Sequence, residues 1–200
     1  MLVKICGITN SEDGLFAIKS KADFIGIILE PGFKRHVDEN KARELIRSFQ
    51  TYPVFTVGVF LEKDFSKVEK KAKDLNLEWV QVMAPKHKSD LEPLKKFRKL
   101  LVVPVNPDGS YEPLLYPIDE NDYLLYDFKE PGSGKAFNWK AFSKIESAPF
   151  FLAGGLTSSN VKEAIEQTGP NGVDTSSGVC KRDNIKKDPE KIVEFIGQVK

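Results

Sequence analysis

The sequence is poor in the residues that build metal centres and disulfide frameworks. Its 200 residues include two cysteines, Cys6 and Cys180, and two histidines, His36 and His87. There is no CxxC or HExxH motif, and neither histidine has a cysteine or carboxylate partner at a ligand spacing. We therefore expect no metal site. Two cysteines suggest a reducing cytoplasm and make no disulfide framework, although a single Cys6–Cys180 bridge stays open.

Long apolar runs and an excess of one charge are also missing. A run such as FIGIIL (24–29) is much shorter than the roughly 20 residues of a membrane helix. The first residues lack a cleavable signal pattern. With 30 basic and 29 acidic residues the formal net charge is +1, so no global field draws the chain to nucleic acid or an anionic membrane. We expect a cytoplasmic protein with neither kind of partner.

Short β-type runs that alternate with helical patterns fill the chain instead. Strands are expected at 2–6, 23–29, 54–60, 78–83, 100–105, 123–128, 150–155 and 172–177. Helices are expected at 11–21, 38–50, 64–75, 89–100, 138–145, 158–168 and 188–200. Such alternation indicates βαβ units and a parallel sheet.

Eight such units predict an α/β fold, a closed (β/α)₈ TIM barrel formed as a single domain by residues 1–200. An open doubly wound sheet is the competing fold. The fifth unit is the weakest, because residues 106–122 contain three prolines and a glycine. We expect its helix to be short or missing.

Active sites of (β/α)₈ barrels lie at the carboxyl ends of the strands, so the strand ends supply the candidate residues. Cys6 ends the first strand, Arg35 follows the second, and Asp127 ends the sixth. An arginine fork suits a carboxylate, and a carboxylate after an apolar run is costly without a partner or a function. Each also has a plainer reading: a small buried thiol, a surface arginine, and a helix cap or ion pair.

The loops after the seventh and eighth strands offer backbone amides without bulky side chains. They are the usual phosphate site of this fold, and here they contain Gly154, Gly155, Ser176 and Ser177. One glycine pair alone could serve only a tight turn. Two such loops in the last two units favour a phosphate.

Blocks from the first strand to the last helix resemble the phosphoribosylanthranilate isomerase family of tryptophan biosynthesis. These blocks read KICGITN, KRH after the second strand, VGVF, VQV, LLYDFKEPGSGKAFNW, LAGGLTSSNVKEAI and GVDTSSGV. The resemblance implies an enzyme without a cofactor. The reaction would be the Amadori rearrangement of N-(5'-phosphoribosyl)anthranilate, a phosphorylated small molecule, to 1-(2-carboxyphenylamino)-1-deoxyribulose 5-phosphate.

The resemblance also implies roles for single residues. Cys6 would be the general base and Asp127 the general acid, and Arg35 would hold the anthranilate carboxylate. Asp174 would lie near the substrate nitrogen. As a base, Cys6 must act as the thiolate, so its pKa should lie near or below its ordinary value.

The resemblance implies three loops that would hold or cover the substrate. The glycines and serines of the last two loops would hold the phosphate, and Gly132 and Gly134 lie where the family has a mobile loop over the substrate.

Three positions depart from the family pattern. Met83 stands where the family usually has histidine, and PGFKRH replaces a Ser-Pro-Arg loop, which leaves the register of Arg35 open. Cys180 stands where glutamate is frequent.

Two alternatives remain open at this stage. Histidine-pathway isomerases with related barrels typically use two aspartates, one of them on the first strand, and Cys6 in that place argues against them. A non-catalytic barrel that binds a phosphorylated metabolite would need Cys6 or Asp127 to point away from the pocket. The sequence leaves open whether the chain is a monomer or a homodimer.

Overall fold

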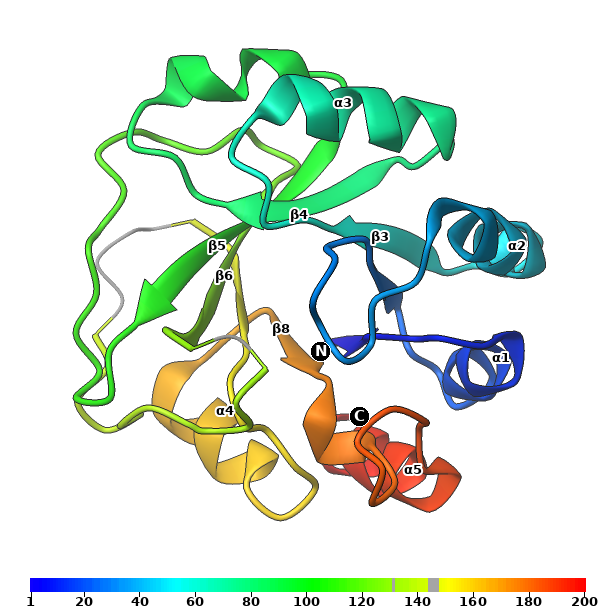
Figure 1. Ribbon diagram of the computed structural model, residues 1–200. Helices are drawn as coiled ribbons and strands as arrows, with labels where there is room; N and C mark the ends of the chain where they lie inside the picture. The colour runs from blue at the N-terminus through cyan, green and yellow to red at the C-terminus, as the bar shows by residue number, and fades with distance from the viewer. Residues whose placement is uncertain (131, 144–147) are drawn as a thin grey trace.

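Eight parallel strands close into a barrel in chain order (Figure 1). The computed structural model describes residues 1–130, 132–143 and 148–200. The strands are β1 Leu2–Cys6, β2 Phe24–Ile28, β3 Phe55–Val59, β4 Trp79–Met83, β5 Arg98–Val105, β6 Tyr123–Phe128, β7 Phe150–Leu152 and β8 Gly172–Thr175. β1 pairs with both β2 and β8, so no edge remains. The predicted (β/α)₈ barrel is confirmed, and the open doubly wound sheet is wrong.

Aromatic side chains fill the barrel at the amino ends of its strands. The Phe24 ring meets the Trp79 ring edge to face at 5.1 Å and the Phe151 ring at 5.4 Å. Gly172 makes room for this layer, because a Cβ there would lie 2.5 Å from the Phe151 ring. The barrel is therefore a packed core at this end, and a site can form only at the other.

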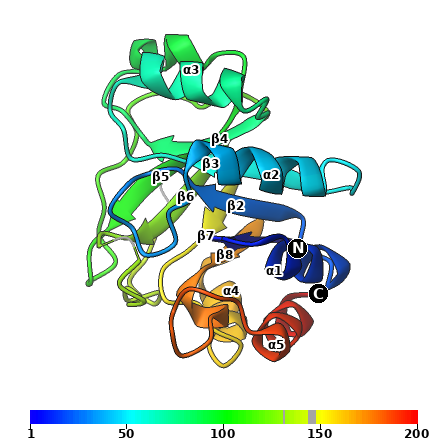
Figure 2. The ribbon, with the colours of Figure 1, turned by 45° about the vertical axis from the view of Figure 1, so that its right-hand side comes forward.

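Within the described residues, five α-helices cover the outside of the barrel. They are α1 Ser11–Lys19, α2 Glu39–Phe49, α3 Phe65–Asp74, α4 Val161–Thr168 and α5 Pro189–Val199. Four begin at a side chain that accepts a backbone N–H of the first turn: Asn10, Asp38, Asp64 and Asp188. Figure 2 shows α1 and α5 side by side with the chain ends near each other, and Lys200 Nζ pairs with Asp23 Oδ2 at 2.9 Å.

The unit after β5 has no helix, as the prolines predicted. Residues 106–122 run along the left side of the barrel in Figure 1 as turns and extended chain. Tyr111 takes part of a helix's place, since its ring packs 4.9 Å from that of Tyr126 on β6.

The helix predicted at 89–100 is wrong. The chain forms only a 3₁₀ helix, η1 (Lys88–Leu94), with Pro93 inside it, and β5 already begins at Arg98. Lys99 belongs to the strand because its backbone N–H donates to Asp122 Oδ1 at 2.8 Å and its buried ammonium pairs with Asp122 Oδ2 at 3.0 Å. This partner lies just before β6, so a local pattern could not reveal it.

The helix predicted at 138–145 is also wrong in its described part. Residues 139–141 form a turn, and residues 144–145 lie outside the described residues. Phe142 is buried here, with its ring 4.9 Å from that of Tyr126 and 6.2 Å from that of Phe150. Aromatic packing thus covers β6 and β7 where a helix was expected.

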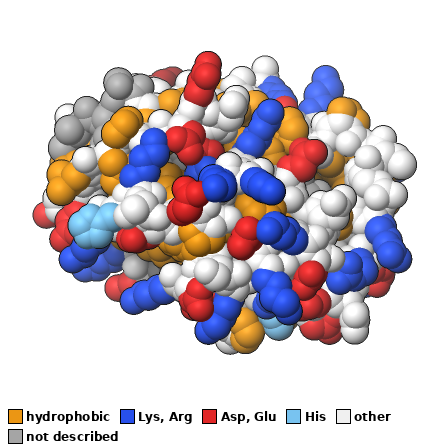
Figure 3. All heavy atoms as spheres, turned by 90° about the horizontal axis from the view of Figure 1, so that it is seen from above, with side chains coloured by type: hydrophobic (Ala, Val, Ile, Leu, Met, Phe, Trp, Pro, Cys, Tyr) orange, Lys and Arg blue, Asp and Glu red, His pale blue; other side chains and the backbone are white. Residues whose placement is uncertain are grey.

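The surface carries both signs of charge. On the face in Figure 3, lysine and arginine side chains alternate with aspartate and glutamate side chains. None of the helices in the described residues is long and apolar enough to cross a membrane.

Candidate active site

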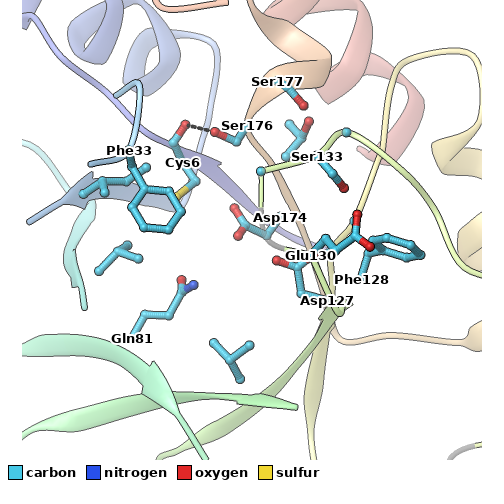
Figure 4. A pocket seen from close by; sticks show the side chains of 18 of the residues that line it. Cys6, Phe33, Gln81, Asp127, Phe128, Glu130, Ser133, Asp174, Ser176 and Ser177 are labelled. Carbon is cyan, nitrogen blue, oxygen red and sulfur yellow. Dashed lines mark hydrogen bonds between the residues drawn. The ribbon is translucent and has the colours of Figure 1, made fainter. Parts of the chain in front are cut away.

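A pocket opens at the carboxyl ends of the strands, where Figure 4 shows Cys6 facing Asp127 and Asp174 across it. Every candidate residue from the sequence lines this pocket: Cys6, Arg35, Asp127, Gly132, Gly134, Gly154, Gly155, Asp174, Ser176 and Ser177. The structure therefore brings together residues from β1, β6, β8 and four loops. Neither Cys6 nor Asp127 points away from the pocket.

Cys6 reaches the barrel mouth because β2 has a glycine beside it. A Cβ at Gly26 would lie 2.7 Å from Cys6 Sγ, so any larger residue would displace the thiol. Cys6 and Cys180 are both free thiols, which excludes the bridge between them. Burial raises the pKa of the Cys6 thiol above its ordinary value, and Lys4 is the charge that most opposes this shift. The direction is opposite to the one expected from the sequence.

A buried ion pair lies beside the thiol. Lys4 Nζ donates to Asp174 Oδ2 at 2.9 Å, and both residues are buried. Burial disfavours the ammonium, but the charges of Asp174 and Cys6 outweigh it and raise the pKa of Lys4. Lys4 therefore stays charged and supplies a fixed positive charge close to Cys6 and Asp174.

Asp127 has the protonation behaviour of an acid that works near neutral pH. Burial, followed by the charge of Asp174, raises the pKa of Asp127 from 3.8 to about 7. A carboxyl group in this range carries its proton in a large part of the molecules at neutral pH and can release it.

Arg35 is buried and projects into the pocket from the loop after β2. Its Nη1 donates to Asn184 O at 2.8 Å and to Asn184 Oδ1 at 3.1 Å. Its Nε is buried without a hydrogen-bond partner among the described residues. Gly7 has φ +74°, and a Cβ there would lie 2.8 Å from this Nε, so the bare backbone of Gly7 gives the guanidinium its place. The register of Arg35 within PGFKRH thus places it in the pocket.

The loops after β7 and β8 are tied to each other. Thr175 Oγ1, at the end of β8, donates to Leu156 O in the loop after β7 at 2.8 Å, and Asn160 Nδ2 donates to Gly155 O at 3.0 Å within that same β7 loop. Gly154 and Gly155 have φ of +89° and +63°, which suits glycine. Their backbone amides carry no side chain that could cover them, as an anion site requires.

The loop that contains Gly132 and Gly134 packs onto these two loops. A Cβ at Gly155 would lie 2.8 Å from Gly134 O, and a Cβ at Gly134 would lie 3.4 Å from Ser177 Oγ. The segment 132–136 therefore forms one wall of the pocket.

Sequence reasoning missed several residues that line or support the pocket. The place of Lys4 beside Cys6 could have been predicted, because residues two apart on a strand share a face and Lys4 precedes Cys6 by two. Phe33 lines the pocket and had no motif of its own. Gln81 also lines it and stands in the VQV block, but it was given no role. Lys187 is 1% exposed, and its Nζ donates to Cys6 O at 2.6 Å and to Ser176 O at 2.9 Å. Its position in a basic loop gave no signal.

No group of three or more His, Cys, Asp or Glu side chains placed to hold a metal ion is found within residues 1–130, 132–143 and 148–200.

Comparison with known proteins gives one family. The sequence model of the family described as N-(5'phosphoribosyl)anthranilate (PRA) isomerase matches residues 3–198. The N-(5'-phosphoribosyl)anthranilate isomerase of Streptococcus mutans is 38% identical over 199 residues, which cover 99% of this chain and 98% of that protein.

Solved structures agree. The phosphoribosyl anthranilate isomerase of Thermotoga maritima has a TM-score of 0.81 at 29% identity, over 99% of this chain and 98% of that chain. A phosphoribosyl anthranilate isomerase in complex with reduced 1-(o-carboxyphenylamino)-1-deoxyribulose 5-phosphate has a TM-score of 0.77 at 28% identity, over the same shares. Because sequence and barrel match over nearly the full length, this chain belongs to the N-(5'-phosphoribosyl)anthranilate isomerase family.

Proposed function

We propose that the chain converts N-(5'-phosphoribosyl)anthranilate to 1-(2-carboxyphenylamino)-1-deoxyribulose 5-phosphate by general acid–base catalysis. The observation that carries this proposal is a set of buried polar atoms in one pocket that have no hydrogen-bond partner among the described residues: Arg35 Nε, Gln81 Oε1 and Asp174 Oδ1. Such atoms are costly unless a ligand pairs with them. One donor and two acceptors suit a ligand that has a carboxylate together with N–H or O–H groups.

Asp127 acts as the acid in the first step. It protonates the furanose ring oxygen, and the ring opens to a protonated Schiff base. Its pKa of about 7 supports this role, because an ordinary aspartate would hold almost no proton at neutral pH.

Cys6 acts as the base in the second step. The thiolate removes the proton from C2′, and the resulting enolamine tautomerises to the ketone. Figure 4 shows the thiol and Asp127 on opposite sides of the pocket, so a sugar between them can receive one proton and lose another. The nearby ammonium of Lys4 stabilises the thiolate form.

The two ends of the substrate anchor the sugar. The Nε side of Arg35 holds the anthranilate carboxylate, and Asp174 Oδ1 accepts from the substrate nitrogen. The loops with Gly154, Gly155, Ser176 and Ser177 hold the phosphate, and the loop with Gly132 and Gly134 covers it. Anchoring of this kind can supply several kcal/mol of the barrier by positioning.

A single assay tests the reaction. The purified protein is mixed with N-(5'-phosphoribosyl)anthranilate, and the loss of anthranilate fluorescence is followed. Enzyme-dependent loss supports the proposal. No loss, with binding retained, would favour the non-catalytic barrel, and turnover only of a histidine-pathway aminoaldose would favour that isomerase. We place the reaction in the cytoplasm, a proposal in keeping with two free buried thiols.

A further inference from the structure

The guanidinium of Arg35 is oriented by one residue from the opposite end of the chain. Among the described residues, both of its hydrogen bonds leave Nη1 and end on Asn184, one on the backbone oxygen at 2.8 Å and one on Oδ1 at 3.1 Å. The two residues are 149 positions apart in sequence. Asn184 thus fixes one side of the fork and leaves Nε unpaired.

Asn184 can do this because it lies in a defined turn. The turn spans residues 180–187, between η2 (Ser177–Val179) and α5, and Cys180 pairs with Lys187 at its base. Lys181 N donates to Lys186 O at 2.9 Å, and Asn184 N donates to Lys181 O at 3.0 Å. Asn184 itself has φ +56°, a conformation that asparagine tolerates better than most residues.

The base of the turn is fixed to the active-site strands. The buried ammonium of Lys187 donates to Cys6 O and Ser176 O, and Lys187 N donates to Asp13 Oδ2 at 2.8 Å. Asn184 is therefore held relative to β1 and β8, on which the substrate would rest. The orientation of Arg35 follows the position of these strands.

The chemistry of the acceptor matters as much as its place. A carboxylate at position 184 would pair with Arg35 and cancel the charge that should bind the substrate. The amide and backbone oxygens accept hydrogen bonds without a net charge. They orient the guanidinium and leave its full positive charge available to an incoming carboxylate.

We infer that Asn184 is a positioning residue that aims Arg35 at the substrate carboxylate. The inference rests on the proposed function, because it needs Arg35 to bind that carboxylate.

The test measures binding, so that it does not depend on turnover. Two ligands are titrated by calorimetry: reduced 1-(o-carboxyphenylamino)-1-deoxyribulose 5-phosphate and the phenylamino compound that lacks the carboxylate. Asn184→Gly keeps the positive φ and the backbone acceptor but removes Oδ1. We expect it to weaken binding of the carboxylated ligand by about 10- to 100-fold, as for one hydrogen bond to a charged group, and to leave binding of the other ligand unchanged.

Asn76→Gly is the matched control. Asn76 also has a positive φ, of +54°, but is exposed after α3 and away from the pocket. Asn76→Gly therefore shows whether replacing an asparagine of positive φ by glycine changes ligand binding in general. We expect both ligands to bind it as they bind the wild type.

Arg35→Ala separates this inference from the proposed function. In that background Asn184→Gly should have no further effect, because the group it orients is gone. If Arg35→Ala leaves the affinity for the carboxylated ligand unchanged, the proposed role of Arg35 fails. If Arg35→Ala weakens binding and Asn184→Gly does not, or weakens both ligands equally, only the role of Asn184 fails.

Discussion

At the level of single residues, the order of two pKa values governs how Asp127, the proposed acid, and Cys6, the proposed base, can work together. Asp127 has a pKa of about 7, and burial raises the pKa of Cys6 above its ordinary value. The form with a protonated acid and an ionised base is then a minority at every pH, since Cys6 loses its proton after Asp127. A substrate that brings two anionic ends into the pocket would be turned over by this minority form.

This order predicts the reactivity of the thiol. Only the thiolate is alkylated by iodoacetamide, so the rate of labelling against pH reports the pKa of Cys6. We expect the midpoint to lie above the ordinary value of about 8.5 for a free cysteine. Peptide mapping by mass spectrometry separates Cys6 from Cys180. A midpoint below the ordinary value would mean that the charge of Lys4 overcomes burial.

Replacement of the thiol tests its role in catalysis. Cys6→Ser keeps nearly the same size and the same place beside Gly26, but a hydroxyl is a far weaker base. We expect kcat to fall by roughly 10²- to 10⁴-fold, the usual contribution of a general base, with the affinity for a product analogue unchanged. Near-normal turnover would remove Cys6 from the mechanism.

At the level of elements, the loops after β7 and β8 act as one unit because Thr175 Oγ1 donates to Leu156 O. Thr175→Val keeps the shape and leaves this buried oxygen without its donor. We expect the KM for substrate and the inhibition constant of inorganic phosphate both to rise about 5- to 10-fold, which corresponds to a loss of about 1 kcal/mol.

Thr168→Val is the control for this change. Thr168 Oγ1 donates to Ala164 O at 2.8 Å on α4, so the same substitution removes the same kind of bond on a helix that does not line the pocket. Phosphate affinity should be unaffected there. If both variants lose phosphate affinity to the same extent, the tie between the loops has no special role.

Elements with a strong local pattern could be predicted from the sequence. β2 is buried along its whole length, and the apolar run FIGIIL at 24–29 indicated this. α2 has an equally local pattern, because its buried residues Ala42, Leu45 and Phe49 recur at helical spacing and the Asp38 side chain caps its first turn. Residues 98–99 were misassigned because Asp122, 23 positions away, draws Lys99 into β5. Local patterns predict elements whose partners are their neighbours in sequence and fail where a distant residue decides.

The same limit applies to the candidate site. Strand ends and family blocks led to Cys6 and Asp127, because barrel topology brings strand ends together. Lys187 and Asn184 were missed, since their contacts with Cys6 and Arg35 span 181 and 149 positions in sequence. Both lie in a turn whose composition is that of an ordinary basic loop.

At the level of the whole molecule, the two ends of the barrel differ in what they contribute. The aromatic layer at the amino ends of the strands is apolar and closely packed. The carboxyl ends hold buried ionisable groups, among them Lys4, Asp174 and Lys187. Taking such charges out of water costs free energy that their pairing repays only in part, so the pocket should reduce the free energy of unfolding that the rest of the barrel provides.

Asp127 allows this cost to be measured. Its pKa in the folded chain, about 7, lies above the value of 3.8 that an unperturbed aspartate has, so between these two values the folded state holds the proton more tightly than the unfolded state. Stability from this group is therefore intact below about pH 4 and is lost as pH rises towards 7. At about 1.4 kcal/mol per pKa unit the full shift would correspond to about 4 kcal/mol, and because Asp127 is half-buried we expect about 2 kcal/mol.

Asp127→Asn removes this titration and keeps the shape of the side chain. We expect the variant to be nearly inactive and to gain stability relative to the wild type as pH rises from 5 to 8. Urea unfolding of both proteins at several pH values gives the difference directly, because all other titrating groups are common to both. If the free energies of unfolding of the two proteins change with pH in parallel, the fold does not raise the pKa of Asp127. Its role as a neutral-pH acid then loses its physical basis.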